Sequence, residues 1–163
     1  MNIVLIGMPG CGKSTIGVLL AKTMLFDFVD TDLVIQNKYG KSLCDIIDQE
    51  GLEGFKAIEN EILSALKYQN CVVATGGSAV YGSKAMENLK KQGKITYLKL
   101  SPEDISTRIK NITTRGVVIK KGDTVNDLYA ERAPLYEKYA DITIDCTGLT
   151  VEECVKAVLD GTK

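Results

Sequence analysis

The chain has 163 residues, with 20 lysines and arginines against 21 aspartates and glutamates, so its formal net charge is −1. This length, with 45% hydrophobic residues, is typical of one globular domain, which we expect to cover residues 1–163. The balanced charge lacks the basic patch of a nucleic-acid-binding protein, so we expect a small-molecule partner and a monomer. The absence of a signal-peptide pattern and of a spanning-length apolar stretch predicts a cytoplasmic protein without a membrane partner.

Histidine is absent from the sequence. Its absence excludes Ser-His and Cys-His catalysis and metal sites with histidine ligands. The five cysteines are scattered and odd in number, which suits neither a disulfide framework nor a structural zinc site, and we expect most of them to be core thiols. Catalysis must therefore depend on carboxylates, cations and a bound ion.

Short apolar runs alternate with helical patterns along the chain, and several runs are apolar on both faces, as in parallel strands covered by helices. The predicted strands are residues 3–6, 26–29, 71–74, 95–98 and 142–144. The predicted helices are residues 14–24, 83–92 and a C-terminal helix that starts near Val151. The sequence therefore predicts an α/β fold with three layers, in which helices flank a five-stranded parallel sheet.

Two segments do not fit this alternation. Residues 41–67 are too long for one crossover helix, and we interpret them as part of a helical substrate-binding insert over about residues 31–67. Residues 111–123 contain glycine, threonine and lysine without apolar periodicity. This composition indicates a mobile lid, which enzymes use to exclude water from a transferring phosphoryl group.

The strongest motif is Gly7-Met8-Pro9-Gly10-Cys11-Gly12-Lys13-Ser14, which follows a predicted strand and opens a predicted helix. Its glycines allow backbone N–H groups and the helix N-terminus to face an anion. We expect Lys13 to contact the β- and γ-phosphates of ATP and Ser14 to offer its hydroxyl to Mg²⁺. The expected ATP-binding residues of this segment are Gly10, Cys11, Gly12, Lys13, Ser14 and Thr15.

Two alternatives apply to this loop. A Gly-rich turn between strand and helix can bind nothing, but the complete motif in this setting favours a nucleoside triphosphate. Cys11 is either a reactive thiol near a helix N-terminus or a small filler residue.

Asp30-Thr31-Asp32 stands at the end of the second predicted strand, where both carboxylates reach the carboxyl edge of the sheet beside the phosphate loop. One carboxylate can serve Mg²⁺ and the other a substrate hydroxyl. The alternative is that Asp30 and Asp32 only cap the next helix.

With these motifs, the chain resembles the shikimate kinase family over essentially its whole length. The motifs that carry the resemblance, in order, are the phosphate loop, Asp30-Thr31-Asp32, Gly54-Phe55-Lys56-Ala57-Ile58-Glu59, Thr75-Gly76-Gly77 and Arg132-Ala133-Pro134-Leu135-Tyr136. The resemblance implies a P-loop kinase fold and transfer of the γ-phosphoryl group of ATP to the 3-hydroxyl of shikimate. It also implies a place in chorismate and aromatic amino-acid synthesis.

The resemblance implies roles for individual residues on the acceptor side. Asp30 supports the Mg²⁺ shell through water, and Asp32 binds the substrate hydroxyls and accepts the proton of the attacking one. Gly76 and Gly77 bring backbone amides to the ring, while Arg132 holds the substrate carboxylate. The alternative for Arg132 is a surface charge on its helix.

Other roles concern the nucleotide. By the resemblance, Arg115 moves onto the transferring phosphoryl group, so that Lys13, Asp32 and Arg115 form the catalytic set. Arg108 stacks on adenine, and the turn at residues 146–148 covers the other face of the base. In this chemistry, catalysis comes mainly from positive groups that stabilise the negative γ-phosphoryl oxygens.

Three positions depart from the family pattern. Lys56 replaces an arginine that would be the second clamp on the carboxylate, Ser78 replaces a third glycine, and Gly116 replaces a proline after the lid arginine. The alternative for Lys56 is an ordinary exposed i,i+3 ion pair with Glu59. These departures favour, as an alternative, a kinase for another small hydroxylated carboxylic acid. A second alternative is a catalytically inactive nucleotide-binding regulatory module, against which the retained Lys13, Asp32 and Arg115 argue.

Overall fold

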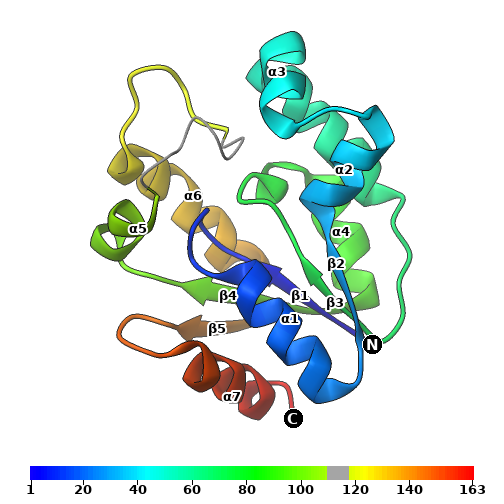
Figure 1. Ribbon diagram of the computed structural model, residues 1–163, viewed down its shortest axis with the longest axis vertical. Helices are drawn as coiled ribbons and strands as arrows, with labels where there is room; N and C mark the ends of the chain where they lie inside the picture. The colour runs from blue at the N-terminus through cyan, green and yellow to red at the C-terminus, as the bar shows by residue number, and fades with distance from the viewer. Residues whose placement is uncertain (110–117) are drawn as a thin grey trace.

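A computed structural model describes residues 1–109 and 118–163 (Figure 1). Arg115 and Gly116 lie outside the described residues, together with most of the segment predicted as a lid. The described remainder of that segment, residues 118–123, contains a turn and neither helix nor strand.

The centre of the fold is a parallel sheet of five strands in the order β2-β3-β1-β4-β5, as predicted. The strands are β1 (Asn2–Ile6), β2 (Asp27–Asp30), β3 (Cys71–Ala74), β4 (Gly93–Lys99) and β5 (Ile142–Asp145). Every residue of β1 and β3 is buried, because helices cover both faces of the sheet at its centre. The apolar runs in the sequence correspond to these strands.

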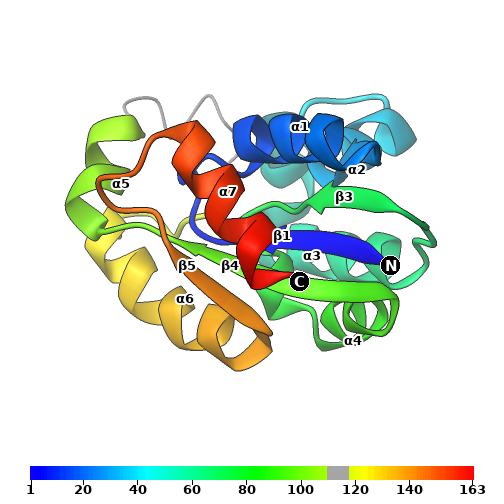
Figure 2. The ribbon, with the colours of Figure 1, turned by 90° about the horizontal axis from the view of Figure 1, so that it is seen from below.

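Helices form the two outer layers. They are α1 (Lys13–Met24), α2 (Thr31–Tyr39), α3 (Leu43–Ser64), α4 (Ser83–Gln92), α5 (Pro102–Arg108), α6 (Val125–Tyr139) and α7 (Val151–Gly161), with a short 3₁₀ helix η1 (Ala79–Tyr81). Figure 2 shows α1 and α7 over one face of the sheet and α4 and α6 over the other. The predicted three-layer α/β architecture is therefore confirmed.

The helices α2 and α3 form the helical insert predicted for residues 31–67, and they rise beyond the sheet in Figure 1. Asp30 caps α2 by accepting a hydrogen bond from the backbone N–H of Asp32, and Ser42 caps α3 in the same way. Gly51, with φ of 76°, breaks the regular geometry of α3. The insert therefore consists of two capped helices, of which the longer one is kinked.

None of the helices in the described ranges is long and apolar enough to cross a membrane. This finding agrees with the absence of an apolar stretch of spanning length in the sequence.

Asn2 ties two neighbouring strands together at the amino edge of the sheet. Its side chain is buried, and its Nδ2 donates to the carbonyl of Tyr68 at 2.8 Å. Its Oδ1 accepts from the backbone N–H of Cys71 at 3.1 Å, at the start of β3. The two bonds fix β1 against β3, and both strands lead into loops at the opposite edge.

We predict that Asn2→Ala lowers the free energy of unfolding by about 1–3 kcal/mol, because the buried N–H of Cys71 and the part-buried carbonyl of Tyr68 lose their partner. Chemical denaturation measures this change. Asn37→Ala, at an exposed position of α2, is the matched control and should alter stability by about 0.5 kcal/mol or less. Equal stability of the two variants would contradict the role given to Asn2.

Candidate active site

The predicted site residues gather at the carboxyl edge of the sheet, as expected where parallel strands end together. The phosphate loop follows β1, Asp30 ends β2, and Thr75-Gly76-Gly77 follow β3. β3 lies between β1 and β2, so these three segments are neighbours in space. Thr75 is fixed to β1, because its Oγ1 donates to the carbonyl of Leu5 at 2.8 Å.

The phosphate loop has the backbone of an anion cradle. Gly10 and Gly12 have φ of 80° and 97°, a region that favours glycine, and α1 begins directly after them. No side chain among the described residues caps α1, so its first N–H groups face the space above the loop. Such a helix start, with its positive dipole end, suits a phosphate group.

The side chain of Lys13 lies inside the phosphate loop and binds its backbone. Its buried ammonium donates to the carbonyls of Gly7 and Met8 at 2.7 and 2.9 Å and lies 3.7 Å from the Cys11 sulfur. Cys11 is itself buried, so the structure places it as a packed side chain of the loop. The charge of Lys13 is thereby held at the mouth of the cradle, where it can attract phosphate.

Ser14 and Asp30 meet beside the loop. The Ser14 hydroxyl donates to Asp30 Oδ2 at 3.2 Å, while Asp30 Oδ1 accepts from the backbone N–H of Asp32 at 2.9 Å. Asp30 therefore caps α2 and also faces the phosphate loop. A hydroxyl and a carboxylate so placed fit Mg²⁺, which prefers oxygen ligands and keeps several waters. Thr15 lies beside Ser14 in the exposed first turn of α1.

Asp32 and Arg132 line a common pocket behind the phosphate loop. Its lining residues are Pro9, Asp32, Leu43, Phe55, Gly76, Gly77, Ser78, Val118 and Arg132. A Cβ on Gly76 would lie 2.5 Å from Asp32 Oδ1, and a Cβ on Gly77 would lie 2.9 Å from Arg132 Nη1. The two glycines are therefore needed where carboxylate and guanidinium approach the backbone.

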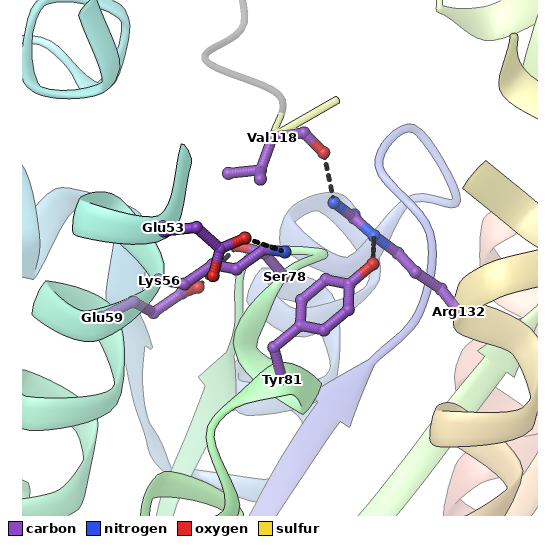
Figure 3. Close-up of polar contacts among 7 residues, drawn as sticks. All are labelled: Glu53, Lys56, Glu59, Ser78, Tyr81, Val118 and Arg132. Atoms are coloured by element: carbon purple, nitrogen blue, oxygen red, sulfur yellow. Dashed lines mark hydrogen bonds and ion pairs between the residues drawn. The ribbon is translucent and has the colours of Figure 1, made fainter. Parts of the chain in front are cut away.

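Arg132 is a buried cation, with 1% of its surface exposed. Its guanidinium donates to neutral groups, the Tyr81 hydroxyl through Nε at 3.2 Å and the Val118 carbonyl through Nη2 (Figure 3). None of the ion pairs between described residues includes Arg132. A buried charge that lacks a counter-ion is costly, so this guanidinium is suited to an anionic ligand rather than to the surface.

Val118 covers this guanidinium from the end of the predicted lid and is itself buried. The cavity left in the pocket measures about 40 Å³, room for only a few water molecules. The cavity is therefore smaller than a ring-sized acceptor, and Val118 is one of the residues that close it.

The motif that contains Arg132 also fixes the glycine turn. The Tyr136 hydroxyl, one turn further along α6, donates to the carbonyl of Gly77 at 2.7 Å. Burial raises the pKa of the Tyr136 hydroxyl, which keeps its proton for this bond. The spacing of Arg132 and Tyr136 thus places a cation and an anchor for the turn on one helix face.

Glu59 is a buried carboxyl beside the pocket that sequence reasoning did not assign. The Ser78 hydroxyl donates to its Oε1 at 2.5 Å, whereas Oε2 has no hydrogen-bond partner among the described residues. The pKa of Glu59 is raised to about 7: burial raises it most, the bond from Ser78 lowers it, the charge of Asp32 raises it, and the charges of Arg132 and Lys13 lower it. The hydroxyl that Ser78 adds is therefore directed at Glu59. The sequence places an acidic residue, Glu59, three positions after Lys56, but it does not show that this residue is buried.

Lys56 does not line the pocket of Asp32 and Arg132. Its ammonium pairs with Glu53 at 3.3 Å and lies 4.0 Å from the centroid of the Tyr81 ring. Its ion pair is with Glu53, one turn earlier on α3, and not with Glu59 as in the alternative (Figure 3). The expected role of Lys56 as a second clamp on the acceptor carboxylate stays a prediction.

Arg108 lies on the nucleotide side, where its Nη1 donates to the carbonyl of Gly10 at 3.5 Å. The turn at residues 146–148 follows β5, which is the edge strand beside β4. Arg115, predicted to act on the phosphoryl group, lies outside the described residues. The structure thus brings together the phosphate loop, Asp30, Asp32, the glycine turn and Arg132.

Comparisons with known proteins agree with this geometry. The family model described as shikimate kinase matches residues 9–163. A shikimate kinase of Francisella tularensis subsp. holarctica is 40% identical over 161 residues, which cover 96% of this chain and 92% of that protein. A shikimate kinase of Thermodesulfovibrio yellowstonii is also 40% identical, over 97% of this chain and 92% of its own length.

Solved structures with the same fold include the shikimate kinase of Acinetobacter baumannii in complex with shikimate. It has a TM-score of 0.87 and 30% identity, over 98% of this chain and 90% of that one. The shikimate kinase of Aquifex aeolicus has a TM-score of 0.84 and 31% identity, over 99% and 95% of the two chains. The chain therefore belongs to the shikimate kinase family.

Proposed function

We propose that this chain transfers the γ-phosphoryl group of ATP to the 3-hydroxyl of shikimate, which gives ADP and shikimate 3-phosphate. The observation that carries the proposal is the pocket in which the carboxylate of Asp32 and the buried guanidinium of Arg132 lie behind Pro9 of the phosphate loop. An acceptor with hydroxyls at one end and a carboxylate at the other matches these two charges. Shikimate has this distribution of groups.

In this reaction the 3-hydroxyl oxygen attacks the γ-phosphorus, and the bond from that phosphorus to the β-phosphate oxygen breaks. Asp32 takes the hydroxyl proton, a role open to a carboxylate within hydrogen-bond reach of the acceptor. The N–H groups at the start of α1 and the ammonium of Lys13 hold the phosphates, while Gly76 and Gly77 offer backbone N–H groups to the ring. Burial raises the pKa of Glu59 to about 7, so near neutral pH it carries less negative charge than an exposed carboxylate and competes less with Asp32.

We propose Mg²⁺ as the metal, with the Ser14 hydroxyl as a ligand and Asp30 in its shell through water. When bound, Mg²⁺ neutralises charge on the β- and γ-phosphates. We further propose that Arg108 stacks on adenine and that Arg115 supports the transferring group. A cytoplasmic monomer with one domain over residues 1–163 stays a prediction.

The release of ADP from ATP, measured with and without shikimate, tests the proposal. We expect shikimate to raise the rate of ADP release strongly in the presence of Mg²⁺. A panel of other small hydroxy acids tests the alternative that Lys56 and Ser78 favour, a kinase for a related acid. If no acceptor raises the rate while ATP still binds, the chain is a nucleotide-binding module and the proposal is wrong.

We predict that Asp32→Asn folds and binds ATP like the unchanged protein but loses about two or more orders of magnitude in kcat, the scale of a positioned general base. Steady-state kinetics and ATP titration measure the two effects. Asp160→Asn, at an exposed position near the end of α7, serves as the control and should keep full activity. A nearly unchanged kcat in Asp32→Asn would show that Asp32 only supports the start of α2.

A further inference from the structure

Tyr81 contacts two cations, Lys56 and Arg132, and the proposed function leaves it without a role. It is the last residue of η1, three positions after Ser78, and it is half-buried. Its hydroxyl accepts a hydrogen bond from Arg132 Nε at 3.2 Å. Its ring centroid lies 4.0 Å from Lys56 Nζ and 5.3 Å from Arg132 Cζ (Figure 3).

The bond from Arg132 Nε decides which edge of the guanidinium is offered to a ligand. A guanidinium can bind a carboxylate through Nε and one Nη, or end-on through both Nη atoms. Nε donates its hydrogen bond to the Tyr81 hydroxyl. Nη2 donates to the Val118 carbonyl in the pocket wall, and Nη1 lies next to Gly77. The edge formed by Nη1 and Nη2 is therefore the one that faces the pocket.

The Tyr81 hydroxyl is well suited to this task. Burial raises the pKa of the Tyr81 hydroxyl, the neighbouring Arg132 lowers it, and the neighbouring Glu131 raises it, so the group stays a neutral phenol with oxygen lone pairs for the guanidinium. A neutral acceptor at Nε holds Arg132 in place without forming an ion pair with it. The positive charge of Arg132 thus remains available to the ligand.

The ring of Tyr81 accounts for the position of Lys56. A lysine over an aromatic face is attracted by the ring quadrupole, and Glu53 adds an ion pair on the same side. Lys56, Glu53 and Tyr81 line a neighbouring cavity of about 360 Å³ together with Ala57, Asn60 and Gly82. Ring and carboxylate together keep the ammonium in that cavity and away from the pocket of Arg132.

We propose that Tyr81 is a positioning and specificity-determining residue for the acceptor carboxylate, because its hydroxyl fixes Arg132 with the Nη1 and Nη2 edge toward the pocket. This inference rests on the proposed function. The carboxylate is then recognised by one oriented guanidinium fork, and Tyr81 acts through Arg132 without touching the reacting atoms.

The test compares Tyr81→Phe with the unchanged protein. This substitution removes the hydroxyl and keeps the ring that holds Lys56. The matched control is Tyr139→Phe, because Tyr139 is also half-buried and carries a cation, with Lys138 Nζ 5.2 Å from its ring centroid, at the far end of α6. The acceptors are shikimate and its methyl ester, in which the carboxylate is masked, and thermal unfolding of each variant is recorded.

We expect Tyr81→Phe to raise the KM for shikimate about tenfold, the scale of one hydrogen bond to a charged group. The kcat should stay within about twofold and the KM for ATP should not change, because Arg132 contacts neither phosphate nor the reacting hydroxyl. The preference for shikimate over the methyl ester should fall by about the same tenfold. Tyr139→Phe should match the unchanged protein in all of these values.

Four results would overturn the inference. A shikimate KM within twofold of the unchanged protein would show that Tyr81 does not orient Arg132. An equal loss on both acceptors, or a loss confined to kcat, would show a general structural role. If the unchanged protein itself releases no ADP in response to shikimate, the proposed function fails first, and the inference fails with it.

Discussion

The buried charge of Arg132 is the constraint around which the acceptor side of this protein is arranged. A guanidinium that is 1% exposed and forms no ion pair within the described part of the chain carries a desolvation cost that no salt bridge offsets there. Neutral oxygens of Tyr81 and Val118 solvate it without neutralising it. The fold thus keeps a free positive charge in a small pocket, which an anionic acceptor can use.

The phosphate side follows the same principle with different groups. Lys13 is held by backbone carbonyls of its own loop, which solvate its charge, and none of the ion pairs within residues 1–109 and 118–163 includes it. Asp30 joins the two sides, because it caps α2, which carries Asp32, and faces Ser14 at the start of α1. A displacement of β2 relative to β1 would therefore move the proposed metal site and the proposed base together, and β3 between them limits such a displacement.

The sequence allowed the sheet, the phosphate loop and the set of residues at its edge to be predicted, because these depend on local patterns: apolar runs, glycine spacing and polar residues at strand ends. It did not predict contacts that depend on the orientation of side chains between helices. Lys56 has acidic residues at equal spacing on both sides, Glu53 and Glu59, and only the packing of α3 against Ser78 decides that Glu59 is buried and Glu53 forms the pair. Tyr81 was missed because a tyrosine after a glycine turn carries no motif of its own.

The central claim is that Arg132 is kept for a ligand and contributes little to the stability of the fold. The most direct measurement is the free energy of unfolding of Arg132→Met and of the unchanged protein, each with and without shikimate. Without shikimate, the variant should lose less than about 1 kcal/mol or gain stability, because methionine removes an unpaired buried charge. Shikimate at about 100 times its Kd should stabilise the unchanged protein by about 2.7 kcal/mol and the variant not at all. A variant that is strongly destabilised, yet still stabilised by shikimate to the same extent, would contradict this account.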